Sequence, residues 1–102
     1  MATAYIREYA DIAVTYGKYL QAGAEPAIAD QAVSTSSTSA QSNAFNANTQ
    51  LIAISTPAAQ AVCCAFGVNP TAATASSLRL PANSIVFFGV KPGHKVALID
   101  VT

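Results

Sequence analysis

The stretch SIVFFGVKPGHKVALIDV, residues 84–101, sets two apolar runs on either side of a turn. Pro92 fixes φ at the first central position of that turn, and Gly93 can adopt the positive φ that a type II turn requires at the second. Runs of this length and apolar content are typical of strands. The stretch therefore predicts two antiparallel strands, Ser84–Val90 and Lys95–Val101, joined as a hairpin by the turn.

Turn signals of the same kind recur from Asn46 onward, about ten residues apart, as in a chain of short strands. They lie at Asn46–Asn48, Thr56–Ala58, Gly67–Pro70 and Leu80–Asn83. Short runs between such signals are typical of a β-sandwich or barrel. We therefore expect an all-β domain, a small antiparallel β-sandwich or jelly-roll-like barrel in residues 36–102, with an N-terminal arm or hairpin in residues 1–35.

The N-terminal region fits two structures. A helical spacing of apolar residues runs through Ile6, Tyr9, Ala13, Tyr16 and Leu20. Gly17 and the β-branched residues near it disfavour a helix. Gly17-Lys18 can instead form the centre of a type II′ hairpin, which sets Tyr16 against Tyr19 across the strands. Strands are the favoured prediction, and the polar segment 34–43 is either a flexible linker or an exposed strand.

Both faces of the run 85–90 are apolar, so both must be covered. Either loops of the same chain or a neighbouring subunit covers the face that does not join the core. In the strand predicted before Pro70, one face is expected in the core, and its residues are Val62, Cys64, Phe66 and Val68. Charged residues make up only 10% of the chain and their charges cancel. A surface so poor in charge repels other subunits weakly, so the composition fits burial against partners and a neutral soluble monomer about equally well.

Several classes of partner and location are disfavoured by the same composition. No cluster of Lys and Arg is present to bind a phosphate backbone, so nucleic acid is not expected. No apolar run approaches the roughly 20 residues that cross a bilayer, and the N-terminal residues do not form an export signal. Cys63 and Cys64 are adjacent, where a disulfide would be strained, so reduced thiols and synthesis in the cytoplasm are expected.

Residues that could carry chemistry are few. His94 is the only histidine, and with two adjacent cysteines it does not form a metal-ligand pattern. A nucleophilic pair of His94 with Cys63 or Cys64 is conceivable, but two buried thiols and a solvated turn histidine account for these residues better. The sequence thus predicts no catalytic residue, cofactor or metal, and the protein is not expected to be an enzyme.

Four segments together resemble small virion proteins of tailed bacteriophages. They are SAQSNAFNANT (39–49), AFGVNPTA (65–72), LRLPANS (78–84) and FFGVKPGHKVA (87–97). The resemblance covers about the C-terminal two-thirds of the chain. It implies a small β-sandwich or jelly-roll-like subunit that decorates or cements the phage head, as a homotrimer where major capsid protein subunits meet.

The proposed contact residues are aromatic, as is usual at the centre of protein interfaces. They are Tyr5, Tyr9, Tyr16, Tyr19, Phe87 and Phe88. The alternatives are a head-fibre, neck or tail structural protein, or a fibre module that binds host sugars through the same rings. In every case the expected location is the virion, and for a cement protein it is the surface of the head.

Overall fold

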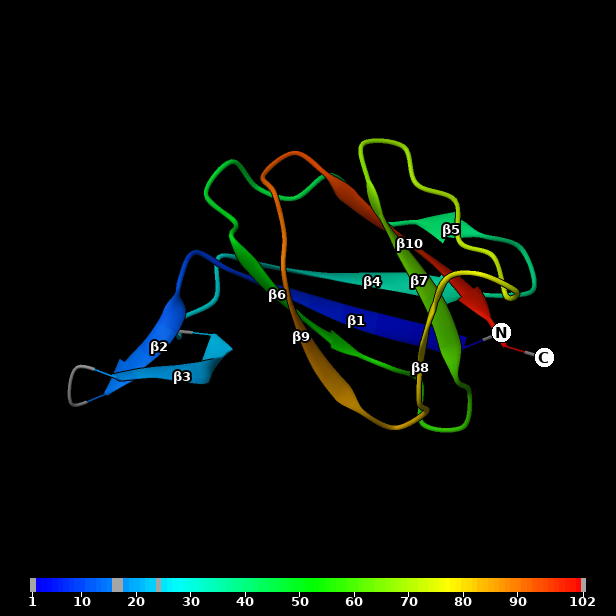
Figure 1. Ribbon diagram of the computed structural model, residues 1–102, viewed down its shortest axis with the longest axis horizontal. Helices are drawn as coiled ribbons and strands as arrows, with labels where there is room; N and C mark the ends of the chain where they lie inside the picture. The colour runs from blue at the N-terminus through cyan, green and yellow to red at the C-terminus, as the bar shows by residue number, and fades with distance from the viewer. Residues whose placement is uncertain (1, 16–17, 24, 102) are drawn as a thin grey trace.

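The computed structural model describes residues 2–15, 18–23 and 25–101, and the side chains among these outside 12–24. It contains only strands, arranged as two packed sheets with a small hairpin beside them (Figure 1). The strands are β1 (Ala2–Tyr9), β2 (Ile12–Thr15), β3 (Lys18–Gly23), β4 (Ala29–Thr35), β5 (Ala40–Gln41), β6 (Leu51–Ser55), β7 (Val62–Gly67), β8 (Leu78–Leu80), β9 (Ile85–Gly89) and β10 (Lys95–Asp100). No helix that is long and apolar enough to cross a membrane occurs in this part of the chain.

Each main sheet has four antiparallel strands. The first sheet has the order β4-β1-β6-β9, and the second has the order β5-β10-β7-β8. The predicted all-β antiparallel sandwich is confirmed, and the sheets are not closed into a barrel. Strand β1 lies inside the first sheet between β4 and β6, so residues 2–9 and 29–35 of the N-terminal region are sandwich strands.

The core fills the space between the two sheets with alternate side chains from each strand. Ile6 of β1 and Ile54 of β6 are almost fully buried, as are Val96 and Leu98 of β10. Val62 and Cys64 of β7 join this cluster, as their period-2 spacing predicts. Phe66 and Val68, predicted on the same side, are not in the core: Phe66 is 39% exposed near the end of β7, and Val68 is 70% exposed beyond it.

The turn at residues 91–94 forms as predicted, but the predicted hairpin is wrong. Gly93 has a φ of +81°, and the His94 N–H donates to the Lys91 carbonyl at 3.2 Å. However, β9 pairs with β6 in the first sheet, whereas β10 pairs with β5 and β7 in the second. Phe45 explains the crossing, because its N–H donates to the His94 carbonyl and its carbonyl accepts from the Gly93 N–H. This pairing draws the chain across to the second sheet directly after the turn.

Strands β2 and β3 form a separate two-stranded hairpin, which Figure 1 shows at one end of the sandwich. The strand prediction for this region is confirmed and the helical alternative is wrong. The predicted turn is displaced, because Lys18 lies opposite Thr15 and Tyr19 lies opposite Val14. Lys18 is therefore a strand residue, and the predicted partner residue Tyr16 lies outside the described residues.

A buried carboxylate holds the long connection between β5 and β6 against the sandwich. Glu8 is only 4% exposed, and its Oε1 accepts from the Asn46 N–H and the Thr49 hydroxyl, both at 2.8 Å. Its Oε2 accepts from Gln31 Nε2 at 3.3 Å, and Gln31 Oε1 in turn accepts from the Asn43 N–H at 2.8 Å. One carboxylate and one amide thus fix the path of residues 43–49.

Candidate functional site

The outer face of the second sheet is covered by the chain itself. Gln41 Nε2 donates to Asn69 Oδ1 and to the Pro70 carbonyl, both at 2.8 Å, and Ser39 Oγ accepts from the Ala72 N–H at 3.0 Å. These partners adjoin the β5 edge, whereas the chain returns to β8 at the opposite edge. Residues 68–77 therefore cross over β10 and β7. The outward-pointing residues at the centre of this sheet, Cys63 and Ala97, are fully buried.

The outer face of the first sheet is open. The cross-strand register sets Tyr5 of β1 beside Ser55 of β6 and Ile85 of β9. Tyr5 and Ile85 are 60% and 66% exposed. Both faces of β9 are thus apolar, as predicted. Its inner face packs on the core, whereas at Ile85 no other part of the described chain covers its outer face. This contrast between the two sheets locates the candidate site.

A groove of about 660 Å³ runs along this open face. Its form follows from the size of the side chains, because the small Ala53 lies between the larger Arg7 and Phe87 in one row. Ser55 lies in the same way between Tyr5 and Ile85 in the next row. We call this surface the outer-face groove, and it is defined by Tyr5, Arg7, Tyr9, Ala53, Ser55, Ile85 and Phe87.

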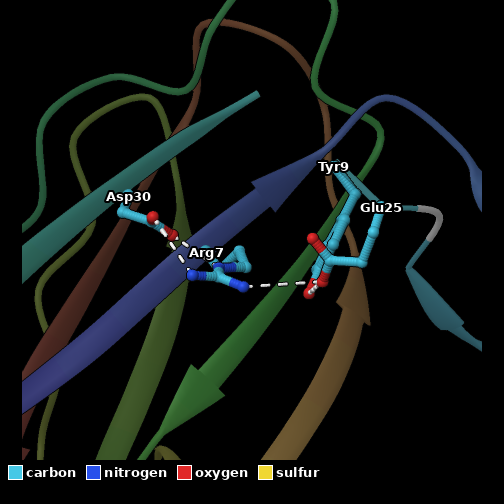
Figure 2. Close-up of polar contacts among 4 residues, drawn as sticks. All are labelled: Arg7, Tyr9, Glu25 and Asp30. Atoms are coloured by element: carbon cyan, nitrogen blue, oxygen red, sulfur yellow. Dashed lines mark hydrogen bonds and ion pairs between the residues drawn. The ribbon is translucent and has the colours of Figure 1, made fainter. Parts of the chain in front are cut away.

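One end of the outer-face groove is polar. Figure 2 shows Arg7 between two carboxylates, with Nε 2.7 Å from Asp30 Oδ1 and Nη1 3.5 Å from Glu25 Oε2. The hydrogen bond and the charge of Asp30, followed by the charge of Glu25, hold the pKa of Arg7 above its ordinary value. The guanidinium is therefore occupied by acids of its own chain, which makes it a poor receptor for an anionic ligand.

Tyr9 closes the same end of the groove. Although it points to the outer face, it is buried, and its ring centroid lies 6.5 Å from that of Phe87. Its hydroxyl donates to Glu25 Oε2 at 2.8 Å (Figure 2). Burial first, and then this hydrogen bond, raise the pKa of Tyr9. Glu25 thus ties the segment that follows β3 to the sheet and leaves the other end of the groove open.

The six predicted interface residues are distributed over different surfaces. Tyr5 and Phe87 line the outer-face groove, and Tyr9 packs at its closed end. Phe88 points the other way, against the core, with its ring centroid 5.0 Å from that of Phe66. Tyr19 lies in the β2–β3 hairpin, and Tyr16 is outside the described residues.

Four further residues complete the groove and were not predicted as site residues from the sequence: Ile85, Arg7, Ala53 and Ser55. Ile85 could have been predicted from the sequence, because residues 85 and 87 share one face of a strand. The small residues at the floor of the groove could not, since a groove at Ala53 depends on the larger neighbouring side chains from β1 and β9. Only the register brings those neighbours together.

The thiols and the histidine lie apart along the second sheet. Cys64 faces Leu98, and His94 precedes β10, so about 13 Å of strand separates the two positions. Both cysteines are buried and free, and burial raises the pKa of Cys64 to about 11. A thiol so buried and protonated is a poor nucleophile. Within the described residues no three His, Cys, Asp or Glu side chains gather to hold a metal ion.

A scan against protein-family models finds no matching family, and searches of curated proteins and of solved structures find no similar protein. The two unlike outer faces of the sandwich, one covered by residues 68–77 and one open at the outer-face groove, are the structural features that bear on function.

Proposed function

We propose that the protein is a decoration or cement protein of a tailed-phage head, which binds major capsid protein subunits through the outer-face groove. The observation that carries the proposal is the difference between the two outer faces. Residues 68–77 cover one face, whereas Tyr5 and Ile85 remain more than half exposed on the other. Exposed apolar side chains grouped beside a groove mark a surface for a protein partner.

The proposed role is to stabilise the assembled shell. A protein that binds a junction between shell subunits, but not the free subunits, adds its binding free energy to the stability of the shell. An interface for this purpose buries on the order of 1,000 Å² or more, with aromatic anchors near its centre. Tyr5 and Phe87 are placed to act as these anchors, and the zero net charge predicts attachment that depends little on salt.

A structural role suits the remaining residues better than catalysis does. The strand length between His94 and Cys64 argues against a thiol–histidine pair. The neutral chain has no excess of cationic side chains to attract a phosphate backbone, so nucleic acid is not proposed as a partner, and neither is a membrane. The proposal places the protein on the outside of the head, after synthesis in the cytoplasm of the bacterial host.

The test compares two substitutions of exposed apolar residues by lysine. Ile85→Lys places a charge at the open end of the outer-face groove, and Val68→Lys places the same charge beyond β7, on a residue that is 70% exposed. Both side chains are solvated, so both variants should fold. Each protein is added to heads of the phage that encodes it, prepared without it, and bound copies are counted after sedimentation.

We expect wild type and Val68→Lys to bind the heads equally, and Ile85→Lys to lose at least tenfold in affinity. Equal binding by all three proteins would exclude the outer-face groove as the contact. Failure of the wild-type protein to bind heads would refute the cement role itself.

A sugar-binding fibre module is the second candidate. The exposed ring of Tyr5 lies near the Arg7–Asp30 pair, and an aromatic ring beside hydrogen-bonding groups suits a sugar ring. This function predicts glycan binding by the isolated protein that Tyr5→Ala abolishes. It also predicts that the groove stays accessible on the finished particle, and immunolabelling of virions would then place the protein on a fibre, neck or tail.

A further inference from the structure

Strand β9 is the last strand of the first sheet, and one of its edges is open among the described residues. The Thr56 N–H donates to the Ser84 carbonyl, and the Val90 N–H donates to the Gln50 carbonyl. In an antiparallel ladder, alternate residues point their backbone groups to the same side. The even-numbered residues thus face β6, and the N–H and C=O groups of Ile85, Phe87 and Gly89 point to the open edge.

The other three edges of the two four-stranded sheets carry features that discourage pairing. Strand β5 has two residues, and β8 has three, one of which is Arg79. Strand β4 carries Asp30 on its exposed side. Short or charged edge strands are the usual protection against edge-to-edge association. In contrast, β9 reads Ile-Val-Phe-Phe-Gly, with neither a charge nor a proline.

We propose that a second copy of this chain pairs with β9 across this edge, antiparallel and about a two-fold axis at Phe87. The pairing sets Phe87 opposite the partner's Phe87, and Ile85 opposite the partner's Gly89. Each of the three facing pairs exchanges two N–H···O bonds, about six in all. The first sheets of the two copies become one continuous sheet, and the two outer-face grooves lie on the same side of it.

The register is self-complementary in both size and charge. The large Ile85 meets glycine, which leaves room for its side chain. Strand β9 itself carries no charged residue, so like charges do not face each other within the paired strands. Each copy has zero net charge, so long-range repulsion does not oppose the approach. A two-fold contact uses the same edge of both copies, so it stops at two subunits. The outer edges of the joined sheet are then the two β4 strands, each with its charged Asp30.

The size of the contact determines how strong the pair is. Two five-residue strands with a few side chains bury less than the roughly 1,200 Å² of a stable interface. We therefore expect a dimer that dissociates on dilution. The phage-protein resemblance implies three copies instead, so the mass of the free protein distinguishes the two arrangements. The inference stands on the edge geometry and does not require that the protein bind a head.

The test uses charges placed at the proposed axis. In Phe87→Lys, two lysines face each other across the axis, and in Phe87→Glu, two glutamates do. Each variant alone should be a monomer by sedimentation equilibrium, with a dimer dissociation constant raised at least tenfold. An equimolar mixture should restore the dimer. The matched control is the pair Ile85→Lys and Ile85→Glu, whose mixture should give no such recovery because residue 85 faces residue 89.

A second variant covers the case in which the Phe87 variants do not fold, which circular dichroism would show. Gly89→Pro removes an N–H that points to the open edge and keeps the side chains of the groove, so it should fold and be a monomer. A wild-type protein that is monomeric at all concentrations, or trimeric, overturns the inference. The inference is also overturned if Gly89→Pro remains a dimer, or if charges at residue 87 leave the dimer dissociation constant unchanged. Head binding is measured separately, so either proposal can fail alone.

Discussion

The buried carboxylate of Glu8 gives the sharpest test of how the sandwich holds its long connection, and the perturbation is Glu8→Ala. The carboxylate is 4% exposed and accepts two bonds of 2.8 Å, from the Asn46 N–H and the Thr49 hydroxyl. Thr49 itself is fully buried, so after the substitution its hydroxyl has no acceptor and little access to water. The segment 43–49 would then lose its main attachment to β1.

The magnitude follows from the number of donors left without a partner. The buried Thr49 hydroxyl left without an acceptor costs roughly 1–3 kcal/mol, and loss of the part-buried bonds from the Asn46 N–H and Gln31 Nε2 adds about 1 kcal/mol, so the expected loss is about 3 kcal/mol. That is a large share of the roughly 5–15 kcal/mol by which small domains are stable. For a chain of this length the melting temperature should fall by roughly 10–20 °C.

The assay is urea unfolding followed by far-ultraviolet circular dichroism, since the chain has no tryptophan to report by fluorescence. Glu8→Gln is the matched control, because its amide oxygen can still accept from both donors, while the charge is lost and an NH2 group replaces the Oε2 atom that accepts from Gln31 Nε2. It should cost about 1 kcal/mol. A loss below about 1 kcal/mol for Glu8→Ala, with an unchanged denaturant slope, would refute the idea that this carboxylate holds the connection.

Three further outcomes follow from the structure. Burial raises the pKa of Cys64 from 9.0 to about 11, so the folded state holds this proton more tightly than the unfolded chain does. The free energy of unfolding should therefore fall as the pH rises from 9 to 11, and this fall should be smaller in Cys64→Ala. In an absorbance titration Tyr9 should ionise above the ordinary tyrosine range, and Glu25→Gln should lower its pKa; an unchanged titration would remove Glu25 as a cause. Gly93→Ala should cost about 1 kcal/mol in urea unfolding, because φ is +81° there and a Cβ meets no atom within 4 Å, so the cost is conformational alone.

Much of the fold was predictable because strands and turns are encoded locally. Pro92-Gly93 specified its turn, and the two-sided apolar run at 85–90 specified a strand with an unsatisfied face. The pairing of strands was not predictable in this way. Whether the chain after Gly93 folds back beside β9 or crosses to the other sheet depends on partners distant in sequence. These include Phe45, more than forty residues earlier, which bonds to residues 93 and 94, and β7, which pairs with β10.

The candidate site was predictable to the same extent. Phe87 followed from the apolar face of its own strand, and Tyr5 from a cluster of tyrosines. The groove itself was not, because its walls come from β1 and β9 and its floor from β6, and their register depends on contacts distant in sequence. The prediction for Phe88 shows the limit of composition, since adjacent aromatic residues in a strand face opposite sides.

The segment 68–77 also offers a practical use of the sandwich. Its tip at Thr74–Ser76 is exposed, while the Ser77 N–H and the Ala73 carbonyl bond across the base of the turn at 3.0 Å. Such a tip tolerates inserted sequence. A peptide placed between Thr74 and Ala75 would extend from the outer face of the second sheet, on the side remote from Tyr5, and would leave the outer-face groove free.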